Sequence, residues 1–269
     1  MAYQPYKYDP SLPAAVVFAI AFGASTTFHA YQLARWRTWY FLPFLVGGLF
    51  STLGYILRGV SISEKPDYSR PTYIIQTVLI LLAPALYAAS IYMILGRIMI
   101  LLGAESYAFI KRSLLTKIFV AADVVSFVVQ AIGGALISSA DTTEEVDRGK
   151  AIIVVGLFLQ IIFFSLFISV TAVFHRRILS RPTRTSQEVS VPWRRYILVL
   201  YAVSVLIMVR SIFRVAEFIQ GPQGTLMTNE VYLYVFDTVL MFFVSVVFNV
   251  YHPSTIIDDA SWVTIYMSG

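Results

Sequence analysis

Charged residues inside long apolar segments are the feature of this sequence that most clearly suggests chemistry. Three of them stand at i, i+4 and i+7, on one face of a helix: Arg210, Arg214 and Glu217. The next apolar segment repeats this spacing with Glu230, Tyr234 and Asp237. A short Gly/Pro loop joins the two segments, so we expect Arg210 and Asp237 at a similar depth, about 10 Å below the membrane boundary. Together with Arg58, these residues predict a polar network in the outer half of a membrane.

Two kinds of chemistry fit such a network. Ion pairs between helices can hold the helices together. Arginine can also bind a phosphate through two hydrogen bonds in bidentate geometry. Carboxylates beside it suit the ammonium group of a zwitterionic head group. The sequence leaves open a structural staple, a site for a lipid head group, and side chains that merely extend to the membrane surface.

A second group of polar residues is expected near the inner ends of the segments: His29, Arg97, Asp123, Gln130, Asn249 and His252. Three of them, His29, Asp123 and His252, are a conceivable zinc set with an open coordination position. Their isolation on separate segments, without an H-E-x-x-H motif, makes metal binding the weaker interpretation. We therefore expect no metal, no cofactor and no catalytic residue.

The segments that must position these residues are long and apolar. Of 269 residues, 58% are apolar, 13% are charged and none is cysteine. Soluble domains carry about 25% charged residues, so this composition excludes a disordered chain, a disulfide-stapled module and an ordinary soluble enzyme. Seven stretches reach the roughly 20 residues of a membrane-spanning helix: 13–34, 40–60, 72–102, 115–138, 151–174, 196–217 and 230–251. The prediction is an all-α integral membrane protein, a seven-transmembrane-helix bundle over residues 13–252.

The basic residues predict its orientation. The loop ends after the first, third and fifth stretches carry eleven of them: Arg35, Arg37, Lys111, Arg112, Lys117, Arg176, Arg177, Arg181, Arg184, Arg194 and Arg195. The opposite side carries five: Lys7, Lys65, Arg70, Arg148 and Lys150. Because basic residues favour the cytoplasmic side, the N-terminus is expected to be extracellular and the C-terminus cytosolic. Residues 1–12 then form an extracellular leader, and residues 253–269 a cytosolic tail.

The net charge of +5 follows from these loops. The longest polar stretch on the basic side, residues 176–195, is rich in Arg, Ser, Thr and Pro and predicts a flexible loop. Its arginines are expected to contact anionic lipids of the inner leaflet: Arg176, Arg177, Arg181, Arg184, Arg194 and Arg195. No fold of a nucleic-acid-binding type accompanies them, so nucleic acid is not an expected partner.

Four stretches match a pattern that extends over nearly the whole chain. They are the leader at 8–11 (YDPS), the stretch from 83 to 97 (APALYAASIYM to Gly-Arg), the stretch from 119 to 134 around Asp123, and the stretch from Arg210 (RSIFR) to His252-Pro253. Together they resemble the fungal RTA-type (RTA-like) family of seven-span lipid-translocating exporters. The charged residues named above are those that match the family's motifs, which makes them the candidate site.

This resemblance implies a fungal integral membrane protein with an extracellular N-terminus, expected in the plasma membrane. It also implies export or translocation of lipids or amphiphiles in stress or drug resistance, with sphingoid bases, phospholipids and sterol-like toxic compounds as candidate substrates. One branch of the family is linked to porphyrin uptake. Two other classes remain open, a seven-helix lipid sensor or receptor-like protein and a zinc-dependent intramembrane lipid hydrolase.

Overall fold

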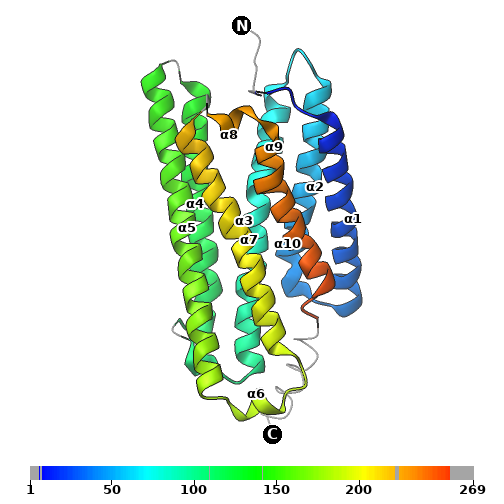
Figure 1. Ribbon diagram of the computed structural model, residues 1–269, viewed down its shortest axis with the longest axis vertical. Coiled ribbons are helices and arrows are strands. Elements are labelled where there is room, and N and C mark those ends of the chain that lie inside the picture. Colours follow the sequence, from blue (N-terminus) through cyan, green and yellow to red (C-terminus); the bar gives the residue numbers. More distant parts are fainter. Residues whose placement is uncertain (1–5, 7, 109, 141, 222–223, 255–269) are drawn as a thin grey trace.

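The computed structural model describes residues 6, 8–108, 110–140, 142–221 and 224–254 (Figure 1). Seven helical stretches in this part of the chain are long and apolar enough to cross a membrane, as predicted. They are α1 (Leu12–Trp36), η1 with α2 (Trp39–Phe41 and Leu42–Ser63), α3 (Arg70–Leu101), α4 (Arg112–Ser139), α5 (Thr143–Ser180), α7 (Trp193–Gln220), and α9 with η3 and α10 (Glu230–Leu233, Tyr234–Thr238 and Val239–Val250). Short connecting helices are η2 (Glu105–Tyr107), α6 (Arg184–Glu188) and α8 (Thr225–Thr228).

The helices form an elongated bundle with α3 and α7 at its centre. In the most apolar window of each of these two helices, 56% of the residues are buried, against 17% for α4. Figure 1 shows α4 and α5 together on one side of the bundle and α1 and α2 on the other, with α10 between α1 and α7. Helix α1 begins at one end of the bundle, where α9 also lies, and we call this the leader end. The opposite end, where α6 lies, is the tail end.

Local sequence explains how several helices begin. The side chain of Ser11 accepts a hydrogen bond from the amide of Ala14, and a proline occupies the first turn of α1. Thr142 and Glu145 form a reciprocal capping box at the start of α5. Arg37, in the left-handed region with φ of 52°, ends α1. These signals fix helix ends more sharply than hydropathy does.

The fifth helix is longer than the predicted span. It has 38 residues, or roughly 57 Å at 1.5 Å per residue, against a hydrocarbon core of about 30 Å. Its first turns are charged, which hid them from a search for apolar residues. There Arg148 pairs with Glu144 at 2.6 Å and Lys150 with Asp147 at 2.8 Å. The helix continues through this charged stretch because of the capping box and these pairs.

The prediction of a flexible loop over residues 176–195 is wrong for much of its length. Helix α5 continues to Ser180, and α6 follows within the stretch. Thr183 caps α6 through the amide of Ser186, and its hydroxyl also donates to the carbonyl of Leu102 at 2.6 Å. The indole of Trp193 donates to the carbonyl of Ser186 at 3.3 Å. Anchoring to the end of α3 orders a segment whose composition alone suggests a loop.

Glycines bring neighbouring helices into backbone contact. A Cβ added to Gly133 of α4 would lie 2.6 Å from the carbonyl oxygen of Gly149 in α5. One added to Gly47 of α2 would lie 2.9 Å from the carbonyl oxygen of Ala83 in α3. Because lipid provides no hydrophobic drive between helices, such close approach is what holds them together.

The last span is not one continuous α-helix. Residues Tyr234–Thr238 form a π-helical turn between α9 and α10. A π-turn widens the helix locally and changes the direction in which the following side chains point. The predicted regular spacing of residues 230–237 is therefore broken within the candidate site.

The described residues begin after the first part of the predicted leader and end within the predicted tail. Residues 1–5, 7 and 255–269 lie outside them. The division into leader, membrane domain and tail therefore stays a prediction.

Candidate functional site

The deepest ion pair joins α7 to the π-turn. Arg210 donates from Nε to Oδ1 of Asp237 at 2.5 Å and from a terminal nitrogen to Oδ2 at 3.4 Å. Each side chain is 3% exposed. The two residues that the sequence placed at a similar depth therefore contact each other. Both charges are removed from solvent, so each depends on the other.

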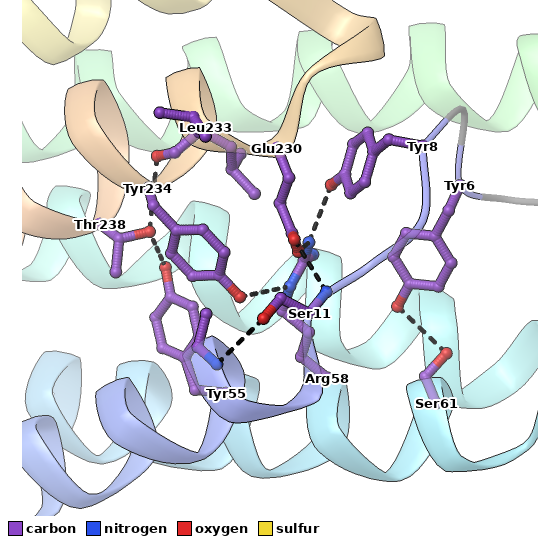
Figure 2. A network of polar contacts seen from close by, with 12 residues as sticks. Tyr6, Tyr8, Ser11, Tyr55, Arg58, Ser61, Glu230, Leu233, Tyr234 and Thr238 are labelled. Atoms are coloured by element: carbon purple, nitrogen blue, oxygen red, sulfur yellow. Dashed lines mark hydrogen bonds and ion pairs between the residues drawn. The ribbon is translucent and has the colours of Figure 1, made fainter.

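Arg58 of α2 is the centre of a second group of contacts (Figure 2). It donates to Oε1 of Glu230 at 2.7 Å, to the hydroxyl of Tyr8 at 2.8 Å and to the hydroxyl of Tyr234 at 3.3 Å. The other oxygen of Glu230 accepts from the backbone amide of Ser11 at 2.8 Å. The pair therefore ties the leader to α2 and to the last span.

Aromatic rings surround the Arg58 guanidinium. Its central carbon lies 5.3 Å from the ring centre of Tyr6, 5.9 Å from that of Tyr8 and 5.6 Å from that of Tyr234, within cation–π range. Burial raises the pKa of the Tyr8 hydroxyl above its usual value, and the charge of Arg58 acts in the opposite direction. At neutral pH Tyr8 is therefore a neutral hydroxyl that accepts from Arg58.

The third pair lies within α7. Arg214 donates to Glu217 at 2.6 Å, and both side chains are at most 10% exposed. The guanidinium also lies 5.3 Å from the ring centre of Phe218. Among the described residues, Nε of Arg214 is buried without a hydrogen-bond partner. This N–H group is therefore available to donate a hydrogen bond to an acceptor on a bound molecule.

These pairs border a cavity of about 190 Å³ in the leader half, which we call the outer pocket. Its walls come from the leader, α2, α3, α7, α8 and the last span. They carry four charged residues, Arg58, Arg214, Glu217 and Asp237, and five aromatic residues, Tyr6, Tyr8, Tyr55, Tyr73 and Phe218. Pockets for drug-sized ligands measure about 300–1,000 Å³, so this one suits a head group rather than a whole amphiphile.

The residues of the predicted outer network lie together and form three ion pairs. All seven residues lie together in the leader half, but Glu230 binds Arg58 of α2, and Arg214 binds its own helix neighbour Glu217. The sequence placed Glu230 and Asp237 on one α-helical face toward α7. The π-turn lies between them, and they contact different helices.

The predicted inner group is divided between two places. His29 contacts the carbonyl of Ser245 at 3.1 Å, and Asn249 donates to Ser25, both between α1 and α10. The carbonyl of His252 accepts from the hydroxyl of Tyr196 at 3.1 Å. Arg97 lies 3.7 Å from the ring centre of Tyr40.

Asp123 and Gln130 lie elsewhere, which corrects their placement with the histidines. Asp123 accepts from the hydroxyl of Tyr92 at 2.9 Å. With Gln130, Arg210 and Arg214 it borders a small cavity of about 10 Å³ in the middle of the bundle. A cavity of this size corresponds to about one water molecule. The helical register, which hydropathy does not specify, turns Asp123 toward α3 and α7.

A zinc set is not assembled in the part of the chain that the structure describes. No group of three His, Cys, Asp or Glu side chains there is close enough to hold a metal ion. The candidate ligands His29 and Asp123 belong to separate clusters, each with its own hydrogen bond. The described part of the chain therefore does not bring the three proposed zinc ligands together.

Sequence reasoning missed several residues of the outer pocket. Tyr55 shares a hydrogen bond of 2.5 Å with Thr238 of the π-turn. Gln76, an amide within an apolar helix, donates to the hydroxyl of Tyr6 at 2.7 Å. The polar side chain of Gln76 was a usable signal. Tyr6 and Tyr55 carried none, because tyrosines are frequent throughout the chain.

Three arginines at the tail end border a second cavity, of about 530 Å³. Its lining consists of Tyr107, Arg176, Arg177, Ser180 and Arg181. Arg177 donates to the carbonyl of Tyr107 at 3.0 Å. Two other arginines of this region make different contacts: Arg184 pairs with Glu188, and Arg194 lies over the ring of Trp193.

Seven apolar helices around a buried, charge-lined pocket define a helical integral membrane protein with an internal polar site. The chain belongs to the RTA1-like family, whose model, described as "RTA1 like protein", matches residues 44–260. This finding confirms the family resemblance read from the motifs.

Several curated proteins of Saccharomyces cerevisiae are similar to it. "Protoporphyrin uptake protein 1" is 36% identical, covering 91% of this chain and 90% of its own length. "Protein RTA1" is 36% identical, covering 93% and 85%. "Sphingoid long-chain base transporter RSB1", from strain Lalvin EC1118, is 26% identical, covering 91% and 72%. No solved structure matches the chain.

Proposed function

We propose that the outer pocket binds the polar head group of an amphiphile and that the protein translocates or exports this molecule. Sphingoid bases, phospholipids and sterol-like amphiphiles are the candidate substrates, in line with a relative named a sphingoid long-chain base transporter. The pocket takes the head group while the hydrocarbon tail stays in lipid. No catalytic role is part of this proposal.

One observation carries the proposal: a cavity inside an apolar bundle is lined by buried residues of both charge signs. Charged side chains within membrane spans are costly and usually serve a transported or bound group. The unused donor of Arg214 suits a phosphate or hydroxyl oxygen. Glu217, at the same wall, suits an ammonium group.

The orientation and location belong to the same proposal. The positive-inside rule puts the leader end outside and the tail end in the cytosol, and the family context suggests a fungal plasma membrane. The outer pocket then faces the outer leaflet. The arginines around the tail-end cavity face anionic lipids of the inner leaflet.

Lipid translocation in reconstituted vesicles tests the proposal. Purified protein is placed in phosphatidylcholine vesicles with a fluorescent sphingoid base or a fluorescent phospholipid. The fraction of probe that moves between the leaflets is followed by quenching from outside. We expect Arg214→Gln to slow the initial rate by about tenfold, as the loss of one charge-assisted contact does.

The matched control is the same substitution at an exposed pair. Arg148 binds Glu144 through the same chemistry, with both side chains more than 70% exposed, so Arg148→Gln should leave the rate unchanged. Wild-type rates equal to those of protein-free vesicles would reject translocation. Binding of the probe without movement would instead indicate a lipid sensor. A folded Arg214→Gln variant with the wild-type rate would exclude this pocket.

A further inference from the structure

A row of hydrogen bonds joins α1 to α10 in the tail half of the bundle. Ser25, His29 and Gln32 of α1 face Ser245 and Asn249 of α10, and we call these five residues the α1/α10 seam. The two serine hydroxyls are 2.7 Å apart, and Gln32 donates to the carbonyl of Asn249 at 2.9 Å. His29 contacts the carbonyl of Ser245, and Asn249 donates to Ser25.

The seam contains more polar groups than it pairs. Among the described residues, Nδ1 of His29, Oε1 of Gln32 and Oδ1 of Asn249 are buried without a hydrogen-bond partner. Buried polar atoms are nearly always paired, because leaving one without water or a partner is unfavourable. If water enters the seam, it can form hydrogen bonds with all three atoms. The closed state lacks these hydrogen bonds, and an open state makes them.

The interfaces on other sides are built differently. Gly48 of α2 packs so closely on Thr26 of α1 that an added Cβ would lie 2.5 Å from its hydroxyl oxygen. Gly133 and Gly149 bring α4 and α5 into backbone contact. Water has no access to such contacts without breaking the packing itself. These two interfaces are closed by backbone packing, whereas the seam is closed mainly by hydrogen bonds, for which water can compete.

Two features connect the seam to the outer pocket. Tyr55, which lines that pocket, stacks on Phe22 of α1 at 5.5 Å between ring centres, and Phe22 lies one turn before Ser25. The π-turn Tyr234–Thr238 lies just before α10 begins. Such turns are weak points of a helix and frequently occur at functional sites. The regular α-helical hydrogen bonding is therefore interrupted between the pocket and the seam.

We propose that the α1/α10 seam is a gate that opens at the tail end, by movement of α10 about the π-turn, so that a head group passes between the outer pocket and the opposite leaflet. This inference rests on the proposed function. The hydroxyl, amide and imidazole groups of the seam line the opened passage. Helices α1 and α2 stay together as one unit, held by their glycine contact.

The sequence has no cysteine, so an engineered pair reports on the gate without interference. In Ser25→Cys/Ser245→Cys the two sulfur atoms replace oxygen atoms 2.7 Å apart, and copper phenanthroline oxidises them to a disulfide. We expect the crosslinked protein to lose lipid translocation and to regain it on reduction. The control Gly23→Cys/Thr52→Cys links α1 to α2, where an added Cβ lies 3.4 Å from Thr52, and should keep transport when oxidised.

Labelling of single cysteines gives an independent measurement that needs neither a crosslink nor transport. Ser25→Cys in the seam and Ser126→Cys in α4 replace serines that are 7% and 1% exposed. A water-soluble maleimide should react several-fold faster with the first, and faster still when a sphingoid base is added. Equal rates at both positions would overturn the gate.

The two proposals fail in different ways. Unchanged transport in the crosslinked seam variant rejects the gate and leaves the proposed function intact. Absence of transport in the wild-type protein rejects the proposed function, and the labelling rates then decide the gate alone.

Discussion

Replacing Asp237 by asparagine keeps the size of the side chain and removes the charge that neutralises Arg210. Both side chains are 3% exposed and share two hydrogen bonds. Removing one partner of a buried pair costs about 3–5 kcal/mol, because the other charge stays buried without compensation. With about 2–4 °C per kcal/mol for a chain of this size, we expect the midpoint of thermal unfolding to fall by roughly 6–20 °C.

The measurement is thermal unfolding in lipid nanodiscs, followed by tryptophan fluorescence. It compares the wild type with Asp237→Asn, Arg210→Met and the double variant Arg210→Met/Asp237→Leu. Replacing a whole buried pair by apolar side chains is often neutral or stabilising by about 1–4 kcal/mol. The double variant should therefore be more stable than either single variant, although it contains two substitutions in the same place.

Two results would refute this reasoning. One is a loss below about 1 kcal/mol in both single variants, the value typical of exposed pairs. The other is a double variant no more stable than the weaker single one, since the coupling would then be absent. Translocation separates stability from function, because we expect the stable double variant to remain inactive. Restored transport would show that Arg210 and Asp237 hold the helices together and do nothing more.

Three further predictions concern other parts of the bundle. Gly133→Leu forces a side chain into the backbone of α5 and should destabilise the protein by about 1–3 kcal/mol. The control Gly134→Leu has open space around its Cβ and should not destabilise it. Equal melting curves for the two variants would contradict the packing argument. Tyr92→Phe leaves Asp123 without its hydroxyl donor and should cost about 1–3 kcal/mol, and in a double-mutant cycle Asp123→Leu should cancel much of that loss. Burial lowers the pKa of His252 from 6.5 to about 4, so the unfolded chain binds a proton first and stability should fall as pH decreases through this window. His252→Gln should show a shallower pH dependence of its unfolding midpoint, and an identical dependence would argue against the buried imidazole.

Hydropathy and charge spacing predict those parts of the structure that depend on local sequence. The seven spans follow from the length of the apolar stretches, and the pairing of Arg210 with Asp237 follows from counting residues on either side of one short loop. Both rest on the constant rise of a helix. The charged start of α5 escaped the same counting because the helix continues beyond its apolar part.

The remaining contacts depend on helix rotation and on distant segments. Which way Asp123 faces is a matter of register, so its contact with Tyr92 was not predictable from depth. The prediction that Glu230 and Asp237 share one helix face assumed regular α-helical spacing, and the π-turn interrupts that spacing. Tyr8 reaches Arg58 from a leader that has no periodic pattern. Sequence patterns describe one helix at a time, whereas these contacts form only when several helices pack.

The contact between Arg58 and Glu230 also bears on how the chain is made. The two residues are 172 positions apart, so α2 is synthesised and inserted long before its carboxylate partner exists. A lone arginine at the centre of a span costs about 2.5–3.5 kcal/mol on insertion scales, and four further spans, α3, α4, α5 and α7, are made before Glu230. The last span therefore completes the membrane insertion of the second. We expect a chain interrupted before Glu230 to hold α2 less firmly in the bilayer, because Arg58 then has no carboxylate partner.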